Sequence, residues 1–358
     1  MALRQYDRQW DTLPENLQAT LSRAYGTGGW TECRRTPKGS SNICFFVTSP
    51  SGRYVLRLSN SRKDLESLRF EIRLIEFLRA RGYPAPELMG GSAGLGYVVQ
   101  DGTFCLLTRF IEGDPYDPTN LRHLLEAGRG LGLYHRLVKD FPGPCYERRI
   151  AGLEELGPLG VHRLDELDSF STEFLSPSDR LILRDAVLQV KGQFSAVARE
   201  LAAIYPRMDR RVIQGSFGRS ALIYEGDRLK GVVDYDRATL EVRGMDLAYT
   251  VKAFCRGHAG EDESFRIGFD LDRCRELMGA YREEESLSEV EIPALPLLFR
   301  AQRLRKVLNK CENFLAKNLE VRQEEKDVRK LATVVEREAA RLSWLEAKAG
   351  DLIEALSG

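Results

Sequence analysis

The sequence predicts an α+β fold in two lobes, a small lobe rich in β-strands and a larger, mainly helical lobe. Runs of strand-forming residues separated by turn residues occupy the first third of the chain. Residues 111–120 contain two prolines, a glycine and two aspartates, which is typical of a linker. Helical periodicity dominates the remainder, apart from a β-rich stretch at 211–236. We therefore place the small lobe at residues 1–110 and the large lobe at 111–358.

Two hairpins and one helix account for the small lobe. Residues 43–48 and 53–58 are β-rich and are joined by the turn-forming run 49–52. Asp101-Gly102, a favoured type I′ pair, predicts a second hairpin. Between the hairpins, apolar residues recur at helical spacing and predict a helix that ends near Gly82. These apolar residues are Leu65, Leu68, Ile72, Ile75 and Leu78.

The large lobe is predicted to hold several helices and one further hairpin. A first helix has one face formed by Leu121, Leu124, Leu125, Gly128, Gly132 and His135. A long helix is expected from about residue 178 to 204, and Glu225-Gly226-Asp227 predicts the hairpin turn. Near the C-terminus, apolar spacing predicts an amphipathic helix over 328–345 with dense charges on its other side. We interpret those charges as a solvated face rather than a binding patch.

Composition narrows the partners and the compartment. The 53 Lys and Arg residues balance the 53 Asp and Glu residues, so charge gives no reason to expect nucleic acid or a membrane surface. The seven cysteines include no close pair such as C-x-x-C, which argues against a disulfide framework or a zinc site and fits a reducing cytoplasm. The N-terminus is polar and charged, which argues against a signal peptide. The sequence has no run of about eighteen consecutive apolar residues, so we expect no membrane span.

The most specific pattern lies between residues 211 and 256. A strand leads into a loop, a hairpin follows and ends in Val233-Asp234-Tyr235-Asp236, and Asp246-Leu247-Ala248 comes shortly after. This frame resembles the catalytic core of the superfamily of aminoglycoside phosphotransferases, homoserine kinases and choline kinases, which includes spore-coat kinase-like proteins. In that superfamily the loop reads H-G-D-x-x-x-x-N and the hairpin ends in I-D-[FYW]-[DE]. The resemblance implies a protein-kinase-like bilobal fold, in which a cleft between the lobes takes the ligand.

The resemblance also implies roles for four positions. Asp234 matches the metal-binding aspartate, whereas Gln214 replaces a histidine, Ser216 replaces the base aspartate, and Ala221 replaces a metal-binding asparagine. A positioned general base contributes roughly 10²–10⁴-fold to rate. Serine carries no charge near neutral pH, and alanine offers no oxygen ligand. We therefore expect impaired catalysis, with ATP and Mg²⁺ as ligands that bind more weakly than in an intact site.

In the small lobe, the stretch around Ser40 and Ser41 resembles the hairpin that covers the phosphates of the nucleotide. Arg57 stands where kinases place the phosphate-pairing lysine, and Glu71 matches the glutamate that pairs with that cation. Each of these features also has a simpler interpretation. The stretch around Ser40 and Ser41 can be an ordinary surface turn, Arg57 an exposed strand residue, and Glu71 a solvent-facing helix residue.

Residues 108–113 resemble the hinge between the lobes, whose backbone commonly holds adenine. This implies nucleotide contacts from Arg109, Phe110 and Ile111. His135 matches a histidine in the first large-lobe helix, and its place on an apolar face favours a hydrogen-bonded core residue over a catalytic one. Simpler roles for Asp234 and Asp246 are a turn cap and a helix N-cap.

Three functions remain open from the sequence. The first is a pseudokinase that keeps the fold and a nucleotide pocket and has a regulatory or structural role, with a protein partner. The second is an active ATP-dependent kinase of a small hydroxyl-bearing molecule, with Asp236 or another carboxylate as the base. The third is an active kinase whose loop has been altered on purpose. The sequence does not identify the acceptor, because fold resemblance alone does not decide function.

Overall fold

A computed structural model describes residues 11–37, 42–60, 63–91, 94–147, 159–166, 176–256, 268–318 and 325–358. The chain forms two compact units. Unit 1 comprises residues Met1–Glu126, Arg136–Tyr146 and Arg219–Ala238, and unit 2 comprises residues Ala127–His135, Glu147–Gly218 and Thr239–Gly358. The lobe boundary expected at residue 110 stays a prediction, because this division by internal contacts does not locate a hinge.

The centre of unit 1 is an antiparallel sheet with strand order β1-β2-β3-β5-β4. Its strands are β1 (Glu32–Arg35), β2 (Ile43–Ser49), β3 (Gly52–Leu58), β4 (Val98–Gln100) and β5 (Thr103–Arg109). Both predicted hairpins are confirmed, since Ser49 pairs with Gly52 and Gln100 pairs with Thr103. Asp101 and Gly102 both have positive φ, 48° and 75°, as a type I′ turn requires.

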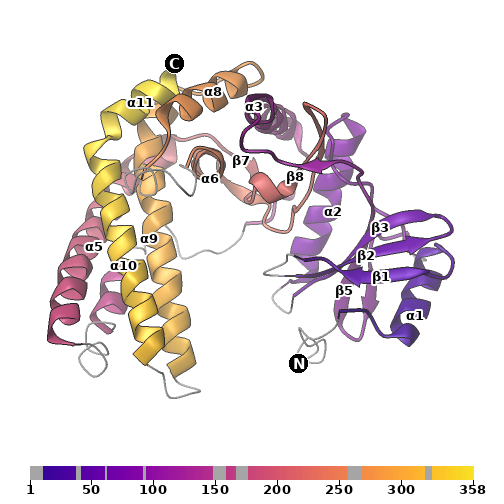
Figure 1. Ribbon diagram of the computed structural model, residues 1–358. Coiled ribbons are helices and arrows are strands. Elements are labelled where there is room, and N and C mark those ends of the chain that lie inside the picture. The colour runs from indigo at the N-terminus through magenta and orange to yellow at the C-terminus, as the bar shows by residue number, and fades with distance from the viewer. Residues whose placement is uncertain are drawn as a thin grey trace. The chain divides into compact units, whose positions relative to one another are not determined.

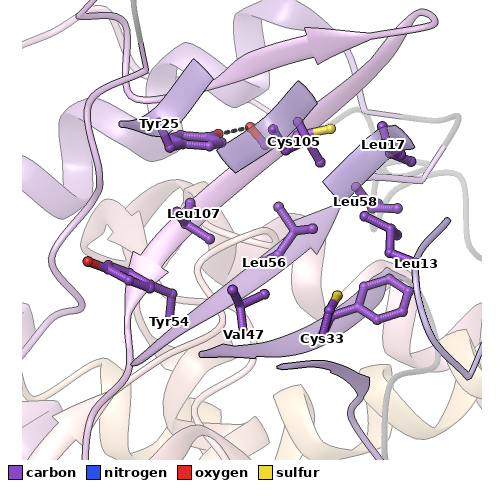
Figure 2. Close-up of a cluster of buried hydrophobic side chains, with 12 residues drawn as sticks. Leu13, Leu17, Tyr25, Cys33, Val47, Tyr54, Leu56, Leu58, Cys105 and Leu107 are labelled. Atoms are coloured by element: carbon purple, nitrogen blue, oxygen red, sulfur yellow. Dashed lines mark hydrogen bonds between the residues drawn. The ribbon is translucent and has the colours of Figure 1, made fainter. Parts of the chain in front are cut away.

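Two helices cover opposite faces of this sheet. Helix α1 (Glu15–Tyr25) packs its Leu17, Leu21 and Tyr25 on the face that carries Leu56 and Leu107 (Figure 2). The Tyr25 hydroxyl donates a hydrogen bond to the Cys105 carbonyl at 2.5 Å, which ties the helix to β5. Successive strand residues point to opposite faces, so the sheet is buried on both sides.

The second helix, α2 (Leu65–Ala80), is the one predicted from apolar spacing. Its Leu68 and Ile72 pack against Leu106, on the face opposite α1. The Asp64 carboxylate caps its N-terminus by accepting from the Ser67 amide at 2.7 Å. Gly82 follows the helix with a φ of 79°, which confirms the predicted end.

A separate three-stranded sheet in unit 1 has the order β6-β8-β9 and contains the predicted hairpin. Its strands are β6 (Asp114–Pro115), β8 (Leu222–Glu225) and β9 (Arg228–Val232). Strand β6 lies within the predicted linker and pairs Asp114 with Tyr224. The glycine before it, Gly113, has φ 152°, and a Cβ there would lie 2.3 Å from the Tyr224 carbonyl oxygen.

Unit 2 is mainly helical, and helix α3 (Leu121–Leu137) contributes its residues 127–135. The other helices are α5 (Pro177–Ile204), α6 (Gly244–Phe254), α8 (Leu271–Arg282), α9 (Glu291–Asn318), α10 (Glu325–Ala347) and α11 (Ala349–Ser357). Helices α5, α9 and α10 lie side by side as long rods, and α9 also packs on α6 (Figure 1). A small sheet pairs β7 (Arg210–Ile213) with β10 (Thr239–Val242).

The structure corrects one interpretation of the C-terminal charges. On α10, Glu338 is fully buried and Arg341 is 5% exposed, so these two charges do not belong to a solvated face. Apolar periodicity missed them because they share ion pairs inside the helix bundle, which a pattern of residue types cannot show.

All seven cysteines are free thiols, and Cys33, Cys105, Cys255, Cys274 and Cys311 are buried. Among the described residues, no helix is both long and apolar enough to cross a membrane.

Candidate functional site

Arg57 and Glu71 form a bidentate ion pair in unit 1. Arg57 Nη1 and Nη2 lie 2.6 and 2.8 Å from the two carboxylate oxygens of Glu71. Arg57 lies on strand β3 and Glu71 lies on helix α2, where Glu71 is 1% exposed. The simpler interpretations, an exposed strand arginine and a solvent-facing glutamate, are therefore wrong. The pair is the one that the family resemblance implied.

Lys63, just before α2, joins the same pair and was missed by sequence reasoning. Its Nζ lies 2.8 Å from Glu71 Oε2, and its side chain is 8% exposed. Burial would raise the pKa of Glu71, but the charges of Arg57 and Lys63 and their hydrogen bonds outweigh it and lower that pKa to about 2. One carboxylate thus holds two cations in place. A lysine in a connecting segment carries no periodic signal that could have identified it.

Asp234 and Asp236 follow strand β9 in the same unit. Asp234 has φ 70°, a left-handed conformation that is rare outside glycine, and the residue is exposed at the surface. Desolvation by the surrounding protein, the charge of Asp236 and a hydrogen bond with Asp236 raise the pKa of Asp234 to about 7. Two carboxyl groups therefore meet at a position that solvent can reach.

This pair suits a hard divalent cation. Mg²⁺ is commonly bound through one or two carboxylates together with substrate phosphates, and two carboxylates that repel each other gain most from a cation. Asp236 therefore offers an oxygen ligand that Ala221 lacks. Among the described residues, no group of three or more His, Cys, Asp or Glu could hold a metal by itself. The two aspartates fit a metal that reaches the site with a nucleotide.

Hydrogen bonds connect the aspartates to the cations. Asn42 Nδ2 donates to Asp236 Oδ2 at 2.8 Å, and the Asn42 side-chain oxygen accepts from the Asn60 amide at 3.1 Å. On the other side, Lys63 Nζ donates to the Asp236 carbonyl oxygen at 3.4 Å. Cations and carboxylates in unit 1 thus belong to one network that runs from Arg57 to Asp236. We call this network, Arg57, Lys63, Glu71, Asp234 and Asp236, the phosphate cluster.

A hollow of about 400 Å³ lies beside the network. Its lining residues are Asp11, Arg35, Thr36, Pro37, Asn42 and Cys44. Burial raises the pKa of Cys44 to about 11, so this thiol is not a nucleophile near neutral pH. The predicted phosphate-covering residues Ser40 and Ser41 lie outside the described residues.

In unit 2, the carboxylate of Asp246 holds the loop that carries two of the substituted positions, Gln214 and Ser216. Asp246 Oδ2 and Oδ1 accept from the backbone amides of Gln214 and Gly215 at 2.8 and 2.9 Å. Asp246 is fully buried and lies in the first turn of α6, where Arg243 occupies the N-cap position. The simpler interpretation of Asp246 as a helix N-cap is therefore wrong. Two charge-assisted hydrogen bonds therefore fix the backbone of the loop.

His135 supports the same carboxylate. Its Nε2 lies 3.3 Å from Asp246 Oδ2 and its Nδ1 lies 3.0 Å from the Tyr281 hydroxyl. Burial lowers the pKa of His135 more than its hydrogen bond and contact with Asp246 raise it, so the ring is neutral. A carboxylate only accepts, so Nε2 carries the proton and Nδ1 accepts from Tyr281. The prediction of a hydrogen-bonded core histidine is confirmed.

The three substituted positions are all buried. Ser216 is 7% exposed, and its amide donates to Gln214 Oε1 at 2.7 Å, so Gln214 replaces the expected histidine as a support for the loop. Ala221 lies in unit 1, where its carbonyl accepts from the Val233 amide at 2.8 Å. Their roles in catalysis stay predictions.

At the predicted hinge, two backbone amides already make hydrogen bonds within the protein. The amides of Arg109 and Phe110 donate to the carbonyls of Glu87 and Arg53, both at 2.9 Å. The Arg109 side chain points to solvent and pairs with Glu87 at 3.0 Å. Adenine contacts from Arg109, Phe110 and Ile111 stay a prediction. Because the amides of Arg109 and Phe110 already donate within the protein, other backbone groups of this segment would have to donate to adenine.

Known proteins similar to this chain share the predicted fold and family. A homoserine kinase of Rhodopseudomonas palustris (strain BisB5) is 25% identical over 299 residues, which cover 83% of this chain and 84% of that protein. The amicoumacin kinase hAmiN, solved with AMP-PNP, Ca²⁺ and Ami, superposes with a TM-score of 0.66 at 12% identity, covering 90% of this chain and 92% of that one. An aminoglycoside phosphotransferase from Alicyclobacillus acidocaldarius gives 0.60 at 13% identity, covering 96% and 98%.

These structural similarities show the protein-kinase-like α+β fold, in which a small antiparallel sheet is followed by a mainly helical remainder. The model of the APH family, described as the phosphotransferase enzyme family, matches residues 32–283 and so spans both units. The chain belongs to the APH phosphotransferase enzyme family.

Proposed function

We propose that the protein is an active ATP-dependent phosphotransferase whose acceptor is a small molecule with a hydroxyl group. The observation that carries this proposal is the phosphate cluster. Arg57 and Lys63, fixed by Glu71, present positive charge, and Asp234 and Asp236 present carboxylate oxygens on the same network. Perturbed pKa values in a charge cluster that solvent reaches at one end, here at Asp234, are typical of functional sites.

The residues of unit 1 divide the task of binding a nucleotide. The guanidinium and the ammonium suit phosphate oxygens. The two aspartates suit a divalent cation, which when bound neutralises charge on the phosphates. Phosphoryl transfer depends mainly on such positioning and charge stabilisation, so most of the expected rate enhancement does not require a base.

The missing base has a limited cost. Enzymes accelerate their reactions by about 10⁶-fold or more, whereas a positioned base contributes roughly 10²–10⁴-fold. Ser216 in place of the aspartate therefore predicts slow turnover rather than none. A slow kinase is therefore the first candidate, although the substituted loop alone favours a pseudokinase.

The test is acceptor-dependent release of ADP from ATP with magnesium, using an amino alcohol, a sugar, L-homoserine and an aminoglycoside. We expect slow turnover with at least one of them and its loss in Asp234→Asn. The matched control is Asp227→Asn in the turn of the same hairpin, where the side chain is 59% exposed. Ser216→Asp should raise kcat by about 10²–10⁴-fold, and Ser216→Asn, of equal size without charge, should not.

A pseudokinase is the second candidate, because Ser216 is buried and its amide is bonded inward to Gln214. Thermal unfolding with ATP separates the two. A ligand at a hundredfold excess over Kd stabilises the folded state by about 2.7 kcal/mol. Stabilisation that needs magnesium, without turnover by the wild type or Ser216→Asp, would establish the pseudokinase. No stabilisation by any nucleotide would overturn the active kinase, and would leave a pseudokinase without a working nucleotide pocket whose role lies with protein partners.

A further inference from the structure

One face of helix α5 is exposed and carries two leucines. Leu181 is 63% exposed and Leu188 is 57% exposed, the highest values among the exposed large apolar residues of the described chain. They lie seven residues apart and so share one face of the helix, while the opposite face packs on α9 and α10 (Figure 1). A surface helix usually presents charged and polar residues on its outer face, so two leucines in one line indicate a contact surface.

Three further residues continue this strip along the helix. Asp185 and Gly192 each follow a leucine by four residues, and Arg199 lies seven residues beyond Gly192. All three are exposed. A Cβ on Gly192 would meet no neighbouring atom within 4 Å, so the backbone of another helix can approach closely there. We call Leu181, Asp185, Leu188, Gly192 and Arg199 the α5 face.

Polar residues with partners inside the chain border the α5 face on both sides. On one side, Gln189 donates a hydrogen bond to the hydroxyl of Ser343 on α10. On the other side, Lys191 forms an ion pair with Asp165. The lysine therefore brings no unpaired charge to the border, and the α5 face is a strip of limited width.

The charges of the α5 face are complementary to those of a second copy. Asp185 lies seven residues before Gly192 and Arg199 lies seven residues after it, which is about 10.5 Å along the helix in each direction. When two α5 helices cross antiparallel about a two-fold axis at Gly192, each Asp185 faces the Arg199 of the other copy. Each Leu188 then lies next to the axis, where the missing side chain of Gly192 leaves room. A parallel pairing would instead place like charges together.

We propose that the α5 face is the interface of a homodimer, in which α5 of one copy packs antiparallel on α5 of the other. Two-fold dimers are the commonest homo-oligomers, and both subunits contribute the same surface to their interface. Burial of the leucines supplies the apolar contact, and the two ion pairs set the direction and register of the helices. The proposal does not depend on the phosphotransferase function.

The first experiment measures the mass of the full chain by sedimentation equilibrium over a range of protein concentrations. We expect a dimer that dissociates on dilution, and Leu188→Glu should raise its Kd by about 100-fold or more, because each dimer buries two copies of this side chain. Leu121→Glu is the matched control, because that leucine is 49% exposed on a helix other than α5. It should leave the Kd unchanged.

Charge reversal tests the antiparallel register. Asp185→Arg and Arg199→Asp should each raise the Kd by about 10-fold or more, because like charges then face each other twice in every dimer. The double variant restores opposite charges, so its Kd should lie within about threefold of the wild-type value. Arg207→Asp, at an exposed position beyond the end of α5, is the matched control and should have no effect.

A cysteine at the axis tests the two-fold symmetry. In Gly192→Cys the new thiol faces its own copy, so mild oxidation should give a covalently linked dimer. Gly350→Cys, at an exposed glycine of α11 with no neighbouring atom within 4 Å of a Cβ, should not be linked. The wild type, oxidised beside them, controls for the native thiols.

Two results would overturn the proposal outright. One is a wild type that stays monomeric at every concentration, and the other is a dimer whose Kd is unchanged by Leu188→Glu and by both single charge reversals. A dimer that Leu188→Glu weakens, but that the double charge reversal does not restore, would overturn the antiparallel arrangement. Equal melting temperatures of Leu188→Glu and the wild type, measured below the Kd of the dimer, would show that the variant folds.

Discussion

The phosphate cluster and the loop of Gln214 to Phe217 differ in what they keep. In the phosphate cluster the charges that we propose to bind a nucleotide are present, and Arg57, Lys63 and Glu71 are paired at 2.6 to 2.8 Å. In the loop, the side chains at the positions to which the family resemblance assigns catalytic roles are replaced, yet Asp246 holds the backbone through two amides. The backbone shape of the loop and its chemistry therefore depend on different residues. A loop can keep its shape because that shape is set by Asp246, which is not among the replaced positions.

The largest effect is expected at Glu71, because it neutralises two cations at once. Glu71→Gln should destabilise the protein by about 3–5 kcal/mol, the usual cost of leaving buried charge unpaired. Glu76→Gln, an exposed position on the same helix, should change stability by less than about 0.5 kcal/mol. Urea unfolding at pH 7 measures both.

The lowered pKa of Glu71 adds a pH signature. The stabilisation by Glu71 is fully present above its ordinary pKa of 4.5 and is lost as the pH falls toward 2. Equal effects of Glu71→Gln and Glu76→Gln would remove the contrast, and would mean that the ion pair contributes no stability.

The scaffold of the loop is tested by Asp246→Asn, with a smaller expected effect. The asparagine side chain keeps one acceptor oxygen, but its NH₂ group would face a donor, either a backbone amide of the loop or the His135 ring. We therefore expect the free energy of unfolding to fall by roughly 1.5–3 kcal/mol. Asp272→Asn, also in the first turn of a helix but 90% exposed, is the control. A loss at Asp246 below that at Asp272 would show that the loop does not need this carboxylate.

The smallest effect is expected for Asp234, where the pH dependence has the opposite sign. The folded protein holds the Asp234 proton more tightly than the unfolded chain between pH 3.8 and about 7, so stability falls as pH rises through that window. The change should not exceed about 1 kcal/mol, because solvent reaches the side chain. Asp234→Asn should abolish it, whereas Asp227→Asn should not.

Magnesium sharpens this last contrast. It favours the ionised carboxylates, so in the presence of ATP it should stabilise the wild type more at pH 8 than at pH 5.5, and it should have no such effect on Asp234→Asn. Equal stabilisation by magnesium at both pH values would place the metal elsewhere.

The sequence predicted the elements that local rules determine. The Asp101-Gly102 turn and helix α2 follow from turn chemistry and apolar spacing, and the Arg57–Glu71 pair follows from the family resemblance. Strand β10 escaped prediction because four residues paired with a distant strand leave little local pattern. Lys63 and Glu338 escaped because each depends on partners that only the folded chain brings together. Ion pairs between residues that are distant in the sequence are thus the part of the structure that residue patterns do not predict.

The free cysteines have a practical consequence. Burial raises the pKa of Cys33 and Cys105 in unit 1 and of Cys311 in unit 2, so none of the three is a reactive thiolate in the folded chain. Alkylation by a small thiol reagent then requires the surrounding structure to open. Mass spectrometry of the labelled peptides would therefore give a separate opening free energy for each unit in a single sample. The native chain already contains the probes that show whether its two units unfold together or in turn.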